Sequence, residues 1–103
     1  MAENDENKGK IEDNIELGGN IFLNGIGSLD RDNLIVLKKM VGTYAKEISE
    51  KHEKFEKLTI TLKDKELEAS VVIDGKEVKN NVEYDNLFMG LDEALKKVQE
   101  EIS

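Results

Sequence analysis

The dipeptide Asp74-Gly75 constrains the fold more than any other feature of this chain. Asp-Gly is typical of the two-residue type I′ turn between antiparallel strands, because both turn positions need a positive φ. The turn sets the register, so that Val71 lies opposite Val78 and Leu67 lies opposite Val82. Both apolar pairs then fall on one face. The turn and the alternation of side chains therefore predict the same hairpin, with one buried face.

Two further stretches have the period of a strand. Leu58, Ile60 and Leu62 alternate with polar residues, which predicts a half-buried strand before the hairpin. Residues 15–27 form a first extended segment, with the strand itself over 20–26 and glycines that permit a bulge or turn. Within the hairpin, Asn80-Asn81 indicates a bulge or a partly covered face, and a ligand contact is the less favoured alternative.

Apolar residues three and four positions apart predict two amphipathic helices. The first covers about 31–54 and contains Gly42, which we interpret as a close approach of the helix to the sheet. The second has a buried stripe that runs over 87–102. The candidate N-caps are Ser28 or Asp30 for the first helix and Asp85 or Asn86 for the second.

This order of elements predicts an α+β fold. A β-α-β-β-β-α two-layer sandwich, with a four-stranded sheet and two helices on one face, would bury all the apolar stripes together. If the first two strands pair in parallel, the helix between them forms a right-handed crossover.

The N-terminal residues differ in composition from the rest. Residues 1–14 are polar and acidic, so we expect a disordered tail there and a single domain over 15–103. The net charge of −8 divides evenly, with six acids and two bases in residues 1–20 and 17 acids and 13 bases in residues 21–103. This acidity disfavours non-specific nucleic-acid binding, which depends on neutralising phosphates.

Three absences bear on the compartment. The chain has no cysteine, no apolar run of the ~20 residues that cross a bilayer, and no start resembling a signal peptide. We therefore expect a cytoplasmic protein without a membrane partner.

The sequence has no arrangement typical of catalysis. The single histidine, His52, lies among glutamates and lysines at the end of the first predicted helix, where a structural role is expected. Gly25-Ile26-Gly27 lacks the third glycine of a dinucleotide fingerprint, because Asp30 occupies that position, so a tight turn is the better interpretation. Asp30 and Asp32 are explained as a helix cap and a first-turn acid. We expect neither an enzyme, nor a cofactor, nor a metal site.

Two sets of residues are candidates for binding a partner. The lysines that would meet phosphates are Lys38, Lys39, Lys46, Lys96 and Lys97. The alternative is a solvated helix face with ion pairs Glu47–Lys51, Glu50–Lys54 and Glu53–Lys57. The residues that would contact a protein, on the predicted outer face of the sheet, are Phe22, Thr59, Thr61 and Val72.

Three segments have a characteristic pattern: 21–26 leading into a Lys/Glu-rich helix, KFEKLTITL at 54–62, and 67–102 with the run EYDNLF. Together they resemble the ribosome hibernation-promoting factor and ribosome-associated inhibitor family. The similarity covers about 21–102. It implies a module that binds the small ribosomal subunit in the decoding region through basic residues, here the five lysines. The alternative hypothesis is a protein-interaction or self-associating domain that uses the sheet face or a free edge.

Overall fold

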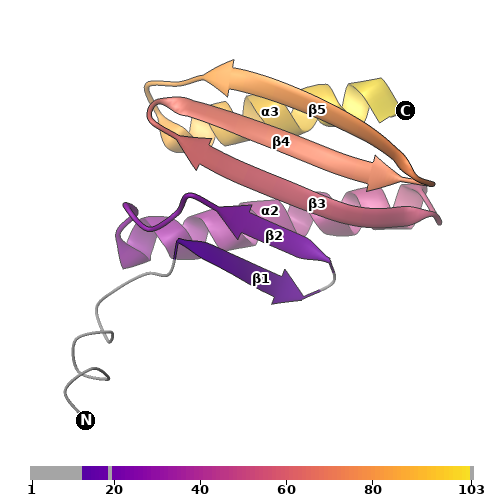
Figure 1. Ribbon diagram of the computed structural model, residues 1–103, viewed down its shortest axis with the longest axis horizontal. Coiled ribbons are helices and arrows are strands. Elements are labelled where there is room, and N and C mark those ends of the chain that lie inside the picture. The colour runs from indigo at the N-terminus through magenta and orange to yellow at the C-terminus, as the bar shows by residue number, and fades with distance from the viewer. Residues whose placement is uncertain (1–12, 19, 103) are drawn as a thin grey trace, which may run out of the picture.

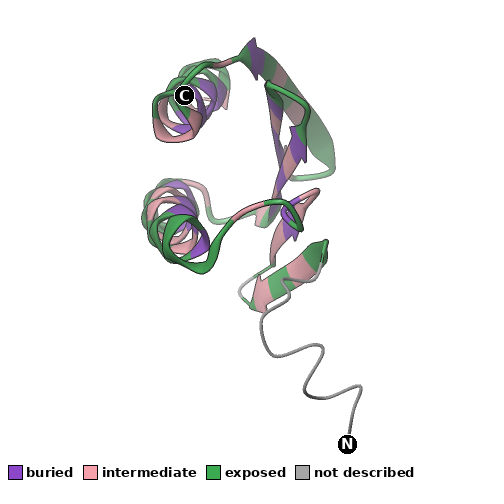
Figure 2. Ribbon diagram, turned by 90° about the vertical axis from the view of Figure 1, so that its left-hand side faces the viewer, coloured by how far each residue is buried: buried purple, intermediate pink, exposed green. Residues whose placement is uncertain are grey.

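Within the described residues, five strands form one sheet, and two helices lie on one of its faces (Figures 1 and 2). The computed structural model describes residues 13–18 and 20–102. The elements are β1 (Asn14–Gly18), β2 (Ile21–Asn24), α2 (Arg31–Lys51), β3 (Phe55–Lys63), β4 (Glu66–Ile73), β5 (Lys76–Glu83) and α3 (Leu87–Ile102). The strands lie side by side in chain order, β1-β2-β3-β4-β5. The α+β class and the placement of both helices on one face are confirmed.

The sheet has one strand more than predicted. The extended segment over 15–27 folds into an antiparallel hairpin, in which Ile15 pairs with Leu23 and Glu16 with Phe22. Gly18, with φ of 90°, and Asn20, with φ of 67°, flank its turn. A register shift lies between Glu16 and Gly18, so Gly18 is part of the irregularity that precedes the reversal of the chain. The predicted N-terminal tail over 1–14 overlaps β1 at Asn14, and residues 1–12 lie outside the described residues.

The connection from β2 to β3 runs through α2, and these two strands pair in parallel. Gly25 allows a tight turn after β2, because its φ is +74° and a Cβ there would lie 2.1 Å from the Leu62 carbonyl oxygen. The Asp30 carboxylate then caps α2 by accepting a hydrogen bond of 2.8 Å from the Asn33 backbone N–H. The helix ends at Lys51, three residues earlier than predicted, because His52 is already extended.

The predicted hairpin register is confirmed along its whole length. Val71 pairs with Val78 and Leu67 with Val82, and no register shift interrupts β4 and β5. The bulge considered at Asn80 is absent from this pair of strands. Instead the Asn80 amide faces α3 and donates a hydrogen bond to the Glu101 carboxylate.

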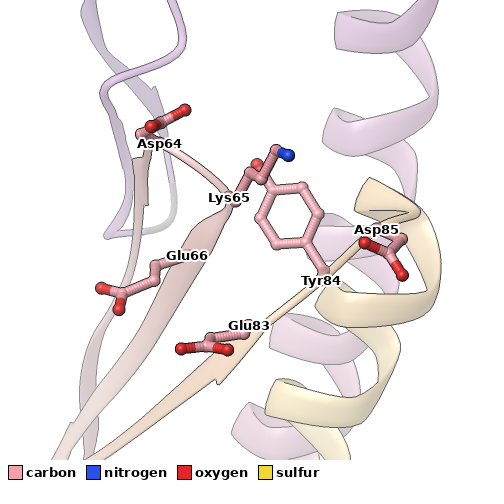
Figure 3. Close-up of a pocket in the computed structure, with 6 residues that line it drawn as sticks. All are labelled: Asp64, Lys65, Glu66, Glu83, Tyr84 and Asp85. Carbon is pink, nitrogen blue, oxygen red and sulfur yellow. The ribbon is translucent and has the colours of Figure 1, made fainter.

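Another hydrogen bond lies at the end of the β4–β5 hairpin that is opposite the Asp74-Gly75 turn. The Tyr84 backbone N–H donates to the Lys65 carbonyl oxygen at 3.0 Å, which ties the β3–β4 turn to the segment that enters α3 (Figure 3). The Asn86 side chain then accepts hydrogen bonds from the Phe88 and Met89 N–H groups and caps that helix.

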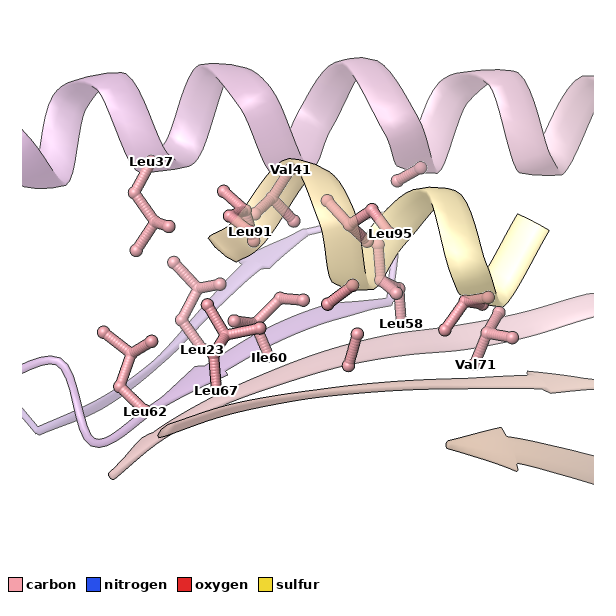
Figure 4. Close-up of a cluster of buried hydrophobic side chains, with 14 of the residues drawn as sticks. Leu23, Leu37, Val41, Leu58, Ile60, Leu62, Leu67, Val71, Leu91 and Leu95 are labelled. Carbon is pink, nitrogen blue, oxygen red and sulfur yellow. The ribbon is translucent and has the colours of Figure 1, made fainter. Parts of the chain in front are cut away.

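The core lies between the sheet and the two helices (Figure 4). α2 packs on β2 and β3, and α3 packs on β4 and β5. Fully buried side chains from the sheet and from both helices meet there: Leu23, Leu37, Val41, Leu58, Ile60, Leu67, Val71, Leu91, Leu95 and Val98.

Gly42 and Gly90 both lie inside helices but have opposite surroundings. The interpretation of Gly42 as a close approach to the sheet is wrong, because a Cβ there would meet no atom within 4 Å apart from its own helix backbone. Gly90 in α3 is the tight position. A Cβ at Gly90 would lie 2.6 Å from the Tyr84 Cβ.

Candidate functional site

The side of the sheet opposite the helices carries no element among the described residues (Figure 2). Strand alternation directs every second side chain to that side. We call this surface the open face. Its half-buried or buried centre consists of Phe22, Thr59, Thr61, Glu68, Ser70 and Val72.

Strand pairing brings the four predicted contact residues onto this one surface. Phe22 of β2 lies opposite Thr59 of β3, and Thr59 lies opposite Ser70 of β4. Val72 and Thr61 occupy the neighbouring positions of the same face, and all four predicted side chains are half-buried. Their neighbours shield them from water although no helix covers them.

Ser70 is the buried polar residue of this face, with 5% of its surface exposed. Its hydroxyl donates a hydrogen bond of 2.8 Å to the Glu77 carboxylate of β5. Lys79 Nζ lies 3.7 Å from the other Glu77 oxygen. The sequence prediction missed Ser70, although its position two residues before Val72 places both on one face.

Charged side chains surround the centre of the open face. The acids on this face are Glu16, Glu66, Glu68, Glu77 and Glu83, and the bases are Lys57, Lys63 and Lys79. Five acids against three bases leave the open face with a formal charge of −2. A partner on this surface would meet a centre of apolar and hydroxyl-bearing side chains, with the Glu68 carboxylate among them, inside an acidic rim.

The structure separates the five candidate lysines into two groups. On α3, Lys96 forms an ion pair of 2.9 Å with Asp92, and Lys97 forms one of 3.1 Å with Glu93. Both lysines of α3 are therefore neutralised by ion pairs with neighbouring acids, whereas the sequence analysis expected them to be available for phosphates.

The three candidate lysines of α2, Lys38, Lys39 and Lys46, lie on the flank turned away from α3. Tyr44 marks the side of α2 that faces α3, because its hydroxyl donates a hydrogen bond to Asp92. Lys46 lies two residues further on, roughly 200° around a helix of about 3.6 residues per turn. No ion pair within residues 13–18 and 20–102 involves Lys38, Lys39 or Lys46.

None of the three glutamate–lysine pairs predicted for the first helix forms an ion pair in the described part of the chain. For the two pairs that involve Lys54 and Lys57, the early end of α2 is the reason, because these lysines lie beyond the helix. Lys54 instead lies 3.9 Å from Asp74 of the hairpin turn. Glu47 accepts a hydrogen bond of 3.2 Å from the Gln99 amide of α3.

The Tyr44–Asp92 hydrogen bond joins the two helices. Burial, together with this bond, raises the pKa of Tyr44 to about 12. The pKa of Asp92 is lowered below its usual value, because its carboxylate accepts a hydrogen bond from the Tyr44 hydroxyl, which has the larger effect, and another from the Lys96 ammonium. The contact is a clamp that holds α2 against α3, across a sequence separation of 48 residues.

A polar hollow of about 490 Å³ opens at the end of the sheet where β5 enters α3 (Figure 3). Its lining is Asp64, Lys65, Glu66, Glu83, Tyr84 and Asp85. Small-molecule sites are lined mainly by apolar side chains with a few polar groups. A lining that is charged at five of its six positions does not have this character.

His52 lies beside carboxylates at the other end of the sheet. A hollow of about 600 Å³ is lined by residues 50–54 together with Ile73 and Asp74. No hydrogen bond to the His52 ring occurs among the described residues, so the hollow contains no paired base and nucleophile there. No group of three His, Asp or Glu side chains in the described ranges could hold a metal ion.

Comparisons with protein-family models, curated proteins and solved structures find no match for this chain. The resemblance to hibernation factors therefore stays a prediction. Over the described ranges, neither helix has the length and apolar character needed to cross a membrane.

Proposed function

We propose that this chain is a protein-interaction domain that binds a basic segment of another protein on its open face. The observation that carries the proposal is the half-buried centre around Phe22, Thr59 and Val72 inside a charged rim. Protein interfaces have this arrangement, with an apolar centre and a polar, solvent-accessible rim. The sheet holds the centre rigidly, so binding would cost little ordering of the backbone.

The charge of the open face selects the chemistry of the partner. With five acids and three bases on this face, and −8 on the whole chain, lysine or arginine side chains of a partner would be attracted. A second copy placed face to face would instead bring two acidic rims together. The favoured partner is therefore a different protein, with basic residues around an apolar side chain that packs on Phe22 and Val72.

The test compares what the intact protein and its variants bind. Proteins captured from a lysate by the wild type are purified, and their affinities are measured by calorimetry. We expect Phe22→Ala and Val72→Asp to weaken binding at least about tenfold, since loss of a central contact costs about 2 kcal/mol. Unchanged affinity in both variants would exclude the open face.

Matched controls come from exposed apolar residues on the helix side. Ile35 and Met89 are 51% and 72% exposed, so Ile35→Ala and Met89→Ala remove similar apolar surface away from the open face. Both should bind like the wild type. Thermal melting of each variant checks that it remains folded.

A second candidate function, ribosome or RNA binding, rests on the α2 lysines. Lys38, Lys39 and Lys46 have no ion pair in the described part of the chain and are available for phosphates. Co-sedimentation with ribosomes at about 50 mM salt, lost near 200 mM and lost in the triple Lys→Gln variant, would favour it. No co-sedimentation at low salt would exclude it.

A further inference from the structure

The last strand of the sheet, β5, has a long uncovered edge. It pairs with β4 from Lys76 to Glu83 without a register shift. It ends the strand order, and in the described part of the chain nothing pairs with its outer side (Figure 1). The opposite edge strand, β1, has five residues and an irregular register. A long regular edge is a template for a further strand.

The hairpin turn determines which backbone groups are free on this edge. In a two-residue hairpin the pair that flanks the turn, Ile73 and Lys76, is hydrogen-bonded, and every second pair after it is as well. The backbone groups of Glu77, Lys79, Asn81 and Glu83 therefore point away from β4. Their side chains lie on the open face, where they would meet those of an added strand.

We propose that the β5 edge pairs antiparallel with β5 of a second copy, with Asn81 on the two-fold axis. Lys79 then lies opposite Glu83 of the second copy, and Glu83 lies opposite Lys79 of the second copy. Opposite charges in directly facing positions stabilise a strand pair. The two Asn81 amides meet at the axis, where each can donate to and accept from the other.

Other registers are less favourable. With Asn80 on the axis, Glu77 lies opposite Glu83 twice, and with Lys79 on the axis the two copies of Lys79 face each other. With Val78 on the axis, Glu77 faces Lys79. However, Glu77 already accepts from Ser70 at 2.8 Å and lies 3.7 Å from Lys79 of its own chain. Glu83 has no such contact in the described part of the chain, so it is free to pair.

This geometry joins the open faces of the two copies. A two-fold axis perpendicular to the sheet leaves all helices on one side and makes one continuous sheet with twice the binding surface. The contact is small, because only residues 79–83 of each strand overlap, whereas stable interfaces bury roughly 800 Å² per partner. We therefore expect a weak dimer whose population rises with concentration.

Sedimentation equilibrium over a concentration series tests the register. The weight-average mass of the wild type should rise from 11.6 kDa toward twice that value. K79E and E83K should each remain monomeric, and the double variant K79E/E83K should recover the dimer. The single variants change the net charge in opposite directions, so loss of the dimer in both cannot come from net charge.

The controls separate this proposal from binding on the open face. Lys57→Glu alters a charge of the same face away from the β5 edge, and Phe22→Ala alters its centre. Both should dimerise like the wild type. A wild type that stays at one chain mass at millimolar concentration overturns the edge proposal, as does a dimer that the single charge reversals leave intact. Neither result bears on the affinity for a basic partner.

Discussion

Replacing Gly42 by alanine should stabilise the protein, whereas the same change at Gly90 should destabilise it. Both glycines lie inside helices and neither has a positive φ. In an exposed helix interior, alanine is favoured over glycine by about 1 kcal/mol. At Gly42 nothing opposes this gain, because the added Cβ meets no atom within 4 Å apart from its own helix backbone.

At Gly90 the same helical gain is offset by a clash. The new Cβ would lie 2.6 Å from the Cβ and 3.0 Å from the Cγ of Tyr84. Tyr84 cannot simply rotate away, because its Cβ is attached directly to the backbone, whose N–H is bonded to Lys65. Overpacking of this kind costs about 1–3 kcal/mol, so the net change at Gly90 is a loss of up to about 2 kcal/mol.

Thermal and urea unfolding followed by circular dichroism measure both changes. For a domain of this size, 1 kcal/mol corresponds to a shift of about 4–8 °C in Tm. We expect Gly42→Ala to raise Tm by about that amount and Gly90→Ala to lower it. Gly75→Ala is a useful control, since its Cβ is also unobstructed but its φ of +77° disfavours alanine. A loss of stability in Gly42→Ala, or a gain in Gly90→Ala, would refute the reasoning.

Two further predictions concern contacts at the helices. Tyr44→Phe should lower the free energy of unfolding by about 0.5–1 kcal/mol at neutral pH, because it removes a partly exposed hydrogen bond to a carboxylate. The pKa of Asp92 is lowered, so this contribution is lost as pH falls through that pKa. The pKa of Tyr44 is raised from 10.0 to about 12. The stabilising contribution is therefore fully present from neutral pH up to about pH 10, and it is lost as pH rises through about 12. Urea unfolding at acidic, neutral and alkaline pH should show the difference from wild type only in the middle range. Asp30→Ala should cost about 1 kcal/mol by removing the N-cap of α2, whereas Asp32→Ala, two residues later in the first turn, should cost less in the same assay.

Local sequence signals were sufficient to predict the strands of the second half of the chain and their register. The Asp74-Gly75 turn and the two-residue alternation act over neighbouring residues, so they specify the hairpin and its register before any tertiary contact forms. The same alternation placed Phe22, Thr59, Thr61 and Val72 on one face. Ser70 was missed because a serine in an apolar strand gives no signal of burial by itself.

Strand β1 and the C-terminal end of α2 could not be predicted without knowledge of the tertiary contacts. Whether residues 15–27 form one strand or two depends on whether Ile15 and Leu17 find a core to pack against, and both do. The apolar period continues to Phe55, which favoured a longer helix. Phe55 instead begins β3, since pairing with Ile73 is available only in the folded sheet.

The chain's own order of apolar and polar residues thus specified an α+β sandwich, the β4–β5 register and the shared face of Phe22, Thr59, Thr61 and Val72, because strand and turn geometry repeat over two to four residues. The grouping of the lysines, the Tyr44–Asp92 clamp and the different surroundings of Gly42 and Gly90 were decided only by the tertiary structure. These features depend on the rotation of one helix against another and on contacts between residues such as Tyr44 and Asp92, which are 48 positions apart. No local periodicity encodes such distances.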